Sequence, residues 1–495
     1  MTENKAKIDK FEIPKEVSDV TKALKDAGFE AYLVGGCVRD LFMRRKPKDW
    51  DVTTNAQPEQ IIPLFPRTFY ENDFGTVAVV NEATNEESLK VVEVTPYRLE
   101  SAYSDHRRPD KVQFSQNLLD DLQRRDFTIN AIAYDPDQSE LVDPYGGVAD
   151  LSRGVIKAVG NPTERFYEDG LRILRAIRLH VELNFPIEAD TEKAILENKD
   201  ILAKVSRERI RDEFSKIIMS DRPADGLLVC KKLGLIQYII PELEEGVGIE
   251  QKGIHVHDVW THLLKSLQHS ADKKYPLHVR LATLLHDIAK PTTRREDKEG
   301  GYTFYGHEVV GSRVTKKILE SLKFSRETIE KVTKLVRWHM FFSDTEQITP
   351  SAVRRLIANV GQENVWDLIN VRLCDRIGTG RPKENPYRLR KYQAMIEEVM
   401  RDPISVGMLK INGAKIMTLL GIAPGPKIGF LLNALLEEIL EDPSLNIEEY
   451  LSKRTQELSK MSDSELKVLA EKGRTKKEAE EEKQVKKIRG KHYVE

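Results

Sequence analysis

The stretch LVGGCVRDLFMRRKPKDWDVT, residues 33–53, decides the fold prediction. Its pattern predicts an apolar strand over 31–34, a turn at two glycines, a short helix over 37–43 and a second strand over 48–53. Further runs rich in β-branched residues predict strands at Thr76–Val80, Leu89–Arg98 and Val112–Phe114. The chain is therefore predicted to begin with a mixed α/β domain that ends near residue 160.

Three carboxylates of this domain are candidate metal ligands. Asp49 and Asp51 would point the same way from one strand, with Trp50 in the opposite layer. Glu93 interrupts the apolar run of a later strand, where an acid is costly unless it is exposed or paired. Three converging carboxylates suit two Mg²⁺ ions, which would activate an attacking hydroxyl and hold a leaving pyrophosphate. The alternative interpretation is an exposed strand face with scattered acids.

The glycine pair Gly35-Gly36 separates the first predicted strand from the short helix. Glycine lets backbone N–H groups approach a phosphate, and a helix N-terminus favours the anion. Arg39 lies one turn into this helix, where a guanidinium would contact a triphosphate oxygen. Most glycine pairs are only tight turns, but a glycine turn followed by a same-face aspartate pair is a more specific pattern.

These residues and four later motifs, in order, resemble bacterial-type (class II) CCA-adding tRNA nucleotidyltransferases and their poly(A) polymerase relatives, within the DNA polymerase beta-like superfamily. The later motifs are RRDFTINA at 124–131, DPYGG at 143–147 followed by Asp150, Leu151 and Gly154, EDGLR at 168–172, and RERI at 207–210 followed by Glu213. The resemblance implies an α+β fold. A nucleotidyltransferase head with a small mixed sheet would precede all-α neck, HD and C-terminal regions.

The resemblance also implies roles for individual residues. Asp49, Asp51 and Glu93 would be catalytic, with Asp49 and Asp51 as Mg²⁺ ligands. Nucleotide contacts would come from Gly35, Gly36, Arg39, Arg125, Asp126, Asn130, Asp169, Arg172, Arg175 and Arg178. RNA contacts would come from Arg107, Arg108, Arg207 and Arg209.

Asp169 and Arg172 have a physical interpretation of their own. On a helix, residues three apart share a face. A carboxylate accepts from an exocyclic amino group and a guanidinium donates to a ring nitrogen, a pair that cytosine and adenine both present. The two side chains are therefore predicted to select C and A without a template; the alternative is an intrahelical salt bridge. Arg175 and Arg178 extend a basic stripe that would track a tRNA backbone or form a solvated face.

The segment RLESAYSDHRRPD, residues 98–110, has no regular periodicity. It resembles the flexible loop that CCA-adding and A-adding members need for the final adenosine, which argues against a CC-only enzyme. A full CCA enzyme and an A-adding enzyme both stay open. A poly(A) polymerase is disfavoured because nothing after the neck resembles the extra motif of such polymerases.

A second set of motifs resembles the HD-domain metal-dependent phosphohydrolases. His262, His286, Asp287 and Asp375 follow that family's order and spacing, and LLHDIAK at 284–290 resembles its central motif. Histidine and aspartate without a thiolate suit Ni²⁺, Mn²⁺, Co²⁺ or another divalent ion better than a structural zinc. His307 and His339 would complete a second metal position, act in proton transfer, or be ordinary buried or surface histidines.

An HD domain joined to a CCA-adding head implies phosphatase or 2′,3′-cyclic phosphodiesterase activity. We expect such a domain to trim or repair damaged tRNA 3′ ends before nucleotide addition. The alternative is a scaffold that supports the tRNA elbow.

Length and composition agree with a cytoplasmic protein of several domains. The 495 residues carry 78 basic and 80 acidic side chains, which excludes a globally basic nucleic-acid coat. Three widely spaced cysteines fit a reducing compartment, and no apolar signal or membrane-spanning stretch is present. The predicted regions are a head at 1–160, a neck at 161–248, an HD domain at 249–385, a C-terminal helical region at 386–460 and a charged tail at 461–495, either an RNA-contacting arm or a solvated end.

The predicted activity is addition of CCA to the 3′ end of tRNA, with CTP and ATP as substrates and Mg²⁺ in the head. An A-adding enzyme or a poly(A) polymerase is the first alternative. An HD phosphohydrolase with a non-catalytic RNA-binding head is the second.

Overall fold

The computed structural model describes residues 5–7, 10–70, 75–101, 111–251, 256–296, 301–341 and 348–469. The chain divides into two compact units. The first comprises residues 1–249, 267–280 and 316–329, and the second comprises residues 250–266, 281–315 and 330–495. None of the described helices is long and apolar enough to cross a lipid bilayer.

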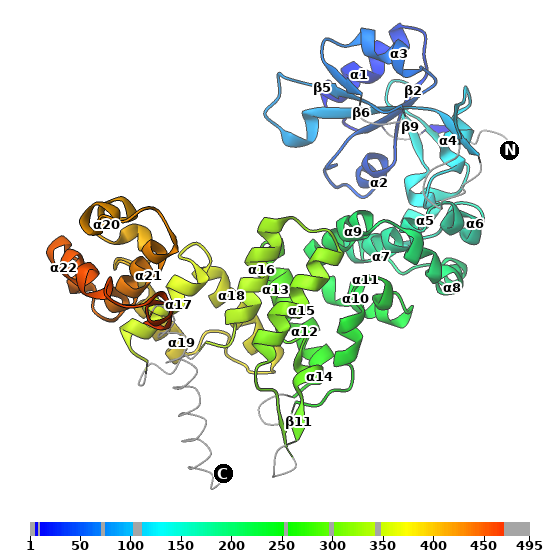
Figure 1. The fold of residues 1–495 in the computed structure, drawn as a ribbon. Coiled ribbons are helices and arrows are strands. Elements are labelled where there is room, and N and C mark those ends of the chain that lie inside the picture. The colour runs from blue at the N-terminus through cyan, green and yellow to red at the C-terminus, as the bar shows by residue number, and fades with distance from the viewer. Residues whose placement is uncertain are drawn as a thin grey trace. The chain divides into compact units, whose positions relative to one another are not determined.

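An eight-stranded mixed sheet organises the start of the first unit (Figure 1). Its strands, in spatial order, are β1 (Lys5–Lys7), β10 (Glu140–Val142), β9 (Ala133–Asp135), β2 (Ala31–Val34), β3 (Asp51–Thr54), β6 (Val91–Pro96), β5 (Val77–Val80) and β4 (Thr68–Tyr70). Only the β3–β6 pair is parallel among these strands. β7 (Arg98–Ser101) pairs with β8 (Lys111–Phe114) in a separate ribbon. The small mixed sheet confirms the predicted fold class of the head.

Helices cover this sheet because their apolar residues recur at helical spacing. They are α1 (Lys15–Asp26), α2 (Gly36–Phe42), α3 (Pro58–Ile61), α4 (Leu118–Gln123) and α5 (Gly147–Arg153). In α1 the buried residues Val17, Val20 and Leu24 form one face and enter the main core of the head. Trp50 enters the same core, with 3% of its surface exposed.

The second predicted strand of residues 33–53 begins later than expected. Its first residue is Asp51, and Asp49 lies in a bend before it. The two carboxylates therefore do not project from one regular strand as predicted. Lys46, Pro47 and Lys48 precede Asp49, and this run does not pair with a neighbouring strand.

A second difference concerns Asp169 and Arg172, which are predicted to share one face of a helix. The chain instead forms α6 (Pro162–Glu168) and α7 (Leu171–Leu183), separated at Asp169 and Gly170. The Asp169 carboxylate accepts a hydrogen bond from the backbone N–H of Leu171 and so caps the start of α7. A Cβ on Gly170 would lie 2.6 Å from Ile201 Cγ2, so the break also packs closely against the next segment. Asp169 and Arg172 therefore do not share one helix face, contrary to the prediction.

The remaining helices of the neck belong to the first unit. They are α8 (Ala189–Asn198), α9 (Arg207–Met219), α10 (Pro223–Lys232) and α11 (Ile236–Ile239). Arg280 is 2% exposed and donates to the backbone carbonyls of Ile218 and Ser220, so it supplies hydrogen-bond donors to the C-terminal end of α9.

The rest of the described chain is almost entirely helical. Its elements are α12 (Val259–Asp272), α13 (Leu277–Leu285), α14 (Lys290–Thr293), a short ribbon of β11 (Arg295–Glu296) and β12 (Tyr302–Thr303), α15 (His307–Ser321), α16 (Arg326–Trp338), α17 (Pro350–Val360), α18 (Val365–Gly378), α19 (Tyr387–Val399), α20 (Gly413–Leu420), α21 (Pro426–Glu441) and α22 (Glu448–Leu458). Arg354, 6% exposed, donates to the carbonyls of Leu440 and Glu441 and thereby ties α17 to the end of α21.

Candidate active sites

The head brings the predicted catalytic carboxylates together through its sheet topology. β3 and β6 run parallel with Asp51 in register with Glu93, so neighbouring strands about 4.8 Å apart place both side chains on one face. Asp49, in the bend before β3, is exposed, and Asp51 is partly buried. The pairing of Asp51 with Glu93 across the sheet could not be inferred from spacing along the chain.

The glycine turn lies directly against these carboxylates. Gly35 has φ +81°, and a Cβ on it would lie 3.2 Å from both Asp51 Oδ2 and Arg125 Nη1. A Cβ on Gly36 would lie 3.6 Å from Arg39 Nη2 and 3.8 Å from Asp49 Oδ1. Residues without a side chain are thus placed where two acids and two guanidiniums converge.

The electrostatics of this cluster fit a divalent cation. Burial, Asp49 and Glu93 together raise the pKa of Asp51 to about 7, although Arg125 and Arg175 act in the opposite direction. A carboxylate that resists ionisation beside other carboxylates is stabilised by a nearby positive charge. Oxygen donors of this kind are the ligands that Mg²⁺ prefers. The residues present therefore fit the Mg²⁺ expected from the sequence.

A chain of hydrogen bonds connects the helix after the glycine turn to the neck. Arg39 Nη1 donates to Asn130 Oδ1 at 2.9 Å, and Asn130 Nδ2 donates to Asp126 Oδ1 at 3.2 Å. Arg175 on α7 donates to Asp126 Oδ2 at 2.7 Å. Burial opposes ionisation of Asp126, but Arg175 outweighs it and holds the pKa of this carboxyl well below its usual range. Arg125 is held separately by Asp121 at 3.0 Å.

Asp169 and Arg172, the predicted base-selecting residues, each pair with a different residue. Asp169 accepts two hydrogen bonds from Arg209, at 3.0 and 2.7 Å. Arg172 donates to Glu168 at 2.6 Å and to the backbone carbonyl of Arg124 at 2.6 Å. The simple intrahelical Asp169–Arg172 salt bridge, the alternative interpretation, is thus not formed between these described residues.

Of the remaining residues predicted to bind nucleotide or RNA, the structure describes some and not others. Arg178 forms an ion pair with Glu213 at 3.0 Å. Arg207 donates to the carbonyls of Tyr238 and Ile239, so its guanidinium anchors backbone. Arg107 and Arg108, most of the loop 98–110 and the tail after residue 469 lie outside the described residues.

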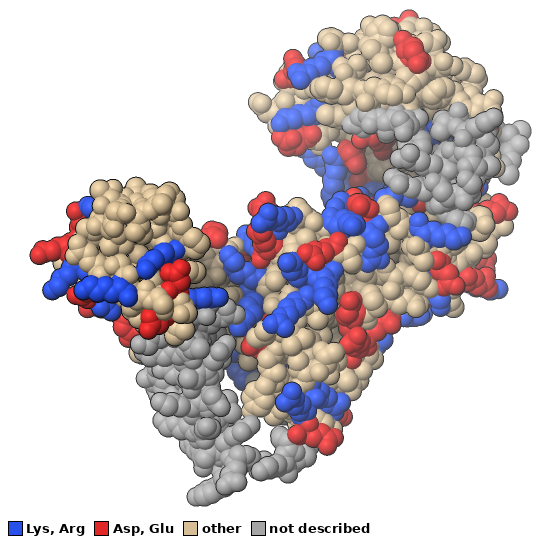
Figure 2. Space-filling view, viewed as in Figure 1, with Lys and Arg blue, Asp and Glu red and all other residues tan. Residues whose placement is uncertain are grey.

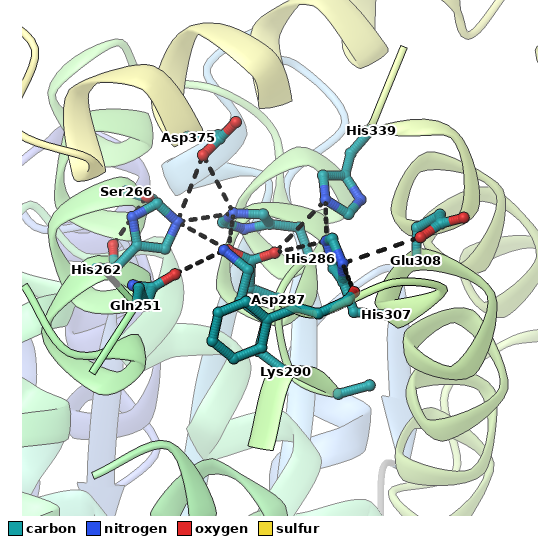
Figure 3. A network of polar contacts seen from close by, with 12 residues as sticks. Gln251, His262, Ser266, His286, Asp287, Lys290, His307, Glu308, His339 and Asp375 are labelled. Atoms are coloured by element: carbon teal, nitrogen blue, oxygen red, sulfur yellow. Dashed lines mark hydrogen bonds and ion pairs between the residues drawn. The ribbon is translucent and has the colours of Figure 1, made fainter. Parts of the chain in front are cut away.

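The HD motifs converge on a buried cluster, which Figure 3 shows. His262 Nε2 lies 2.9 Å from His286 Nε2, 3.2 Å from Asp287 Oδ2 and 3.4 Å from Asp375 Oδ1. His286 Nε2 lies 3.3 Å from the same Asp287 oxygen. Four donor atoms at such separations surround a point that suits one metal ion, because metal–ligand bonds of about 2.0–2.2 Å place neighbouring ligands close to 3 Å apart.

A second set of donors shares Asp287. Its other oxygen, Oδ1, lies 3.1 Å from His307 Nε2 and 3.6 Å from His339 Nε2, and these three residues form a second candidate metal group. In His286, His307 and His339 the ring Nδ1 lies 2.7 Å from the carbonyl of the residue three positions earlier. That hydrogen bond needs Nδ1–H and leaves the Nε2 lone pair for a metal. This geometry favours ligands over ordinary buried histidines.

The charges in the cluster also fit metal binding. Burial opposes protonation of His286, but Asp287 and Asp375 outweigh it and raise the pKa of this histidine to about 10. Burial lowers the pKa of His339 to about 4. The carboxylates of the four-residue group therefore favour a positive charge, which a bound metal ion would supply in place of the proton on His286 Nε2. The second group offers a neutral histidine, His339.

Three further residues of this site were missed by sequence reasoning. Lys290 Nζ lies 2.5 Å from Asp287 Oδ2 and donates to Gln251 Oε1 at 2.6 Å, and Arg372 donates to Asp375 Oδ2 at 2.6 Å (Figure 3 shows the first two). Lys290 is the last residue of LLHDIAK, so the motif held a signal for it. Gln251 and Arg372 carry no such signal.

Gly378 lies between two candidate metal ligands, His262 and Asp375, and its replacement gives a test. A Cβ at Gly378 would lie 2.0 Å from Ser266 Oγ and 2.8 Å from the carbonyl oxygen of His262. Gly378→Ala should therefore push α18, which carries Asp375, away from α12, which carries His262. We expect the affinity for Mn²⁺ to fall by about 10–100-fold, as for lost outer supports of metal ligands. Titration calorimetry with Mn²⁺ measures this.

Gly429→Ala is the matched control, because Gly429 lies within α21 and a Cβ there would meet nothing within 4 Å. It should leave Mn²⁺ affinity unchanged. Equal affinities for Gly378→Ala and the wild type would contradict the positioning role.

Together the fold and the two sites define a nucleotidyltransferase head joined to an HD domain. Sequence profiles agree: the "Poly A polymerase head domain" matches residues 31–157, the "Probable RNA and SrmB-binding site of polymerase A" matches 184–246, and the "HD domain" matches 254–377.

Known proteins identify the family. The CCA-adding enzyme of Limosilactobacillus reuteri (strain DSM 20016) is 31% identical over 442 residues, which cover 89% of this chain and 96% of that protein. The CCA-adding enzyme of Lactobacillus delbrueckii subsp. bulgaricus (strain ATCC 11842) is 46% identical over 209 residues, 42% of this chain and 51% of that protein. The crystal structure of the Bacillus stearothermophilus CCA-adding enzyme in complex with CTP matches with a TM-score of 0.66 and 26% identity, covering 90% of this chain and 98% of that one. The chain belongs to the CCA-adding enzyme family, as its motifs predicted.

Proposed function

We propose that the head uses Asp49, Asp51 and Glu93 to add C, C and A to the 3′ end of tRNA from CTP and ATP. The observation that carries this assignment is the convergence of the Gly35 turn, Asp51 and Arg125, with Glu93 in register on the adjacent strand. Membership of the CCA-adding enzyme family supports the reaction and its substrates.

In this mechanism Asp49 and Asp51, with Glu93 beside them, would hold Mg²⁺, which would supply charge neutralisation and lower the pKa of the attacking hydroxyl. The backbone at Gly35 and Gly36 and the guanidiniums of Arg39 and Arg125 hold the triphosphate. The tRNA 3′ oxygen forms a bond to the α-phosphorus, the bond to the bridging oxygen breaks, and pyrophosphate leaves. Positioning and electrostatics account for most of the catalysis.

Base selection would depend on Asp169 and Arg172. Their present partners, Arg209 for Asp169 and Glu168 for Arg172, hold both side chains at the junction of α6 and α7. Preorganised hydrogen-bonding groups reject a wrong base because that base leaves them unpaired.

Asp169→Ala is expected to relax this selection. Incorporation of UTP and GTP relative to CTP and ATP should rise by at least about tenfold, because one partner of the correct base is lost. Competition assays with all four labelled nucleotides measure the ratio. Asp190→Ala, at an exposed position of α8, is the control and should leave the ratio unchanged. An unaltered ratio in Asp169→Ala would remove this residue from base selection.

The activity itself is tested with a tRNA transcript that lacks CCA, Mg²⁺ and labelled CTP, ATP or both. Two additions with CTP alone, and one more when ATP is present, are expected. Addition of A only to a transcript that already ends in CC would identify an A-adding enzyme. A long run of A would identify a poly(A) polymerase.

The HD cluster favours a second activity. We propose that His262, His286, Asp287 and Asp375 hold Ni²⁺, Mn²⁺, Co²⁺ or another divalent ion and that this site hydrolyses phosphate esters at damaged tRNA 3′ ends. Support comes from the four converging donors and the neighbouring group around His307 and His339. Hydrolysis of 2′,3′-cyclic AMP with added Ni²⁺ or Mn²⁺ is the test.

A further inference from the structure

The loop between α2 and β3 carries a basic cluster that the proposed reaction does not use. Arg44, Arg45, Lys46 and Lys48 are four cations within five residues, and all four are exposed. The loop leads directly into Asp49. Figure 2 shows lysines and arginines over α9, whereas the visible face of the head carries few.

Three of these cations line a pocket of about 280 Å³. Its apolar wall includes Leu41, Pro47 and Trp50, and its rim includes Arg44, Arg45 and Lys46. Two acids, Glu12 and Glu86, also line it. The pocket therefore combines an apolar surface with a basic rim, the composition of a site for an organic anion.

The ion pairs leave two arginines available for a ligand. Lys46 is paired with Glu86 at 2.7 Å. Within the described part of the chain, the guanidiniums of Arg44 and Arg45 form no ion pair or hydrogen bond. Arginine binds phosphate through two parallel hydrogen bonds, which suits both side chains to a phosphate group.

The backbone of Arg44 points to a role for its side chain. Its φ of +55° is left-handed, and it follows α2 where the N–H of Arg44 bonds to the carbonyl of Leu41 and that of Arg45 bonds to the carbonyl of Asp40. Glycine or asparagine normally occupies such a position after a helix because other residues are strained there. A strained arginine beside an apolar-walled pocket supports a hypothesis of function.

The position of the pocket separates it from the incoming triphosphate. The glycine turn is at the N-terminal end of α2, and Arg44 follows its C-terminal end, roughly 10 Å along a helix of this length. Trp50 is buried in the core between its two exposed or half-buried acidic neighbours. The pocket is therefore better placed for the other anionic substrate of the proposed reaction, which is the RNA.

We propose that this pocket is an RNA-binding subsite in which Arg44 and Arg45 hold the phosphodiester backbone of the tRNA substrate. The inference rests on the proposed function of the head. It adds an RNA-binding group on the loop that carries the first catalytic aspartate, so that binding of RNA backbone and placement of Asp49 involve the same segment. A pocket of this size admits one backbone unit and no double helix.

The test is the salt dependence of RNA binding by the full chain. Arg44→Gly/Arg45→Ala should weaken binding of a tRNA transcript lacking CCA by about tenfold, measured by fluorescence anisotropy between about 50 and 200 mM salt. The slope of log affinity against log salt should become shallower by about one for each phosphate that the variant no longer binds. The KM for CTP should stay at its wild-type value, because the glycine turn lies at the other end of α2. Lys22→Ala, at an exposed position on α1, is the control and should change none of these quantities.

The single variant Arg44→Gly separates a binding role from a structural one. Because glycine relieves the left-handed strain, this variant should raise the melting temperature while it weakens RNA binding. Wild-type affinity and salt slope in both variants would overturn the proposal, and so would a raised KM for CTP with unchanged RNA binding. If the wild type binds tRNA through these arginines but adds no nucleotide, the proposed function fails and the RNA subsite stands.

Discussion

Replacement of Asp51 by alanine is expected to reduce nucleotide incorporation by about a thousandfold or more. The carboxylate lies against the Gly35 turn and beside Glu93, where the metal-dependent chemistry of the head is proposed to occur. Loss of a ligand to the catalytic ion removes several kcal/mol of transition-state stabilisation, which corresponds to this factor. Single-turnover incorporation of labelled CTP into a transcript lacking CCA measures it.

Asp51→Asn is the matched variant because it keeps the shape of the side chain and removes only the charge. It should lose incorporation as severely as the alanine variant and keep the tRNA affinity of the wild type. Full incorporation by Asp51→Asn would contradict a role for this carboxylate as a metal ligand.

The raised pKa of Asp51 gives the same variant a second readout. The folded-state pKa of about 7 lies above the ordinary aspartate value of 3.8, so folding takes up a proton between these two pH values. The wild type should therefore lose stability as the pH rises from about 4 to 7 in the absence of metal, and Asp51→Asn should lose less. Melting temperatures in a chelating buffer, compared with buffer containing Mg²⁺, measure the difference, which added Mg²⁺ should reduce.

The local elements of the head could be predicted because their signals are contiguous. The turn at Gly35, the helix after it and the strand through Val52 follow from periodicity within residues 33–53. The proximity of Glu93 to Asp51 depends on the parallel pairing of two strands that lie about 40 residues apart in the chain, and no local pattern determines that pairing. The apolar run around Glu93 singled out this acid, and the register explains why it lies beside Asp51.

The junction at Asp169 could not be predicted from periodicity, and the reason is a tertiary contact. Apolar residues continue at helical spacing through the break, so the pattern favours one helix over 165–180. Gly170 instead packs against Ile201, and Arg209 pairs with Asp169 from a helix about forty residues later. In the same way, the candidate HD ligands follow a recognisable motif, whereas Gln251, which lies outside any helix, and Arg372 on α18 reach the site only through tertiary packing.

The two carboxylate oxygens of Asp287 face different donor groups of the HD cluster. Loss of Asp287 should therefore have a different effect from loss of a histidine that belongs to one group alone. Oδ2 lies with His262 and His286, and Oδ1 lies with His307 and His339. A carboxylate shared in this way would supply one oxygen to each of the two candidate metal positions. Removal of this one residue should therefore affect both positions.

Asp287→Ala is expected to eliminate hydrolysis of 2′,3′-cyclic AMP, by about a thousandfold or more, and to remove both metal ions from the HD domain. His339→Ala should remove only the second ion, because His339 belongs to the second group alone. Metal content of the purified variants, measured by mass spectrometry, and the hydrolysis rate with Mn²⁺ or Ni²⁺ provide the readouts. Addition of CCA should proceed at the wild-type rate in both variants, since the head holds its own carboxylates, and this control shows that the chain is folded. If Asp287→Ala retained hydrolysis, or if the two variants lost the same number of ions, the shared-ligand arrangement would be wrong.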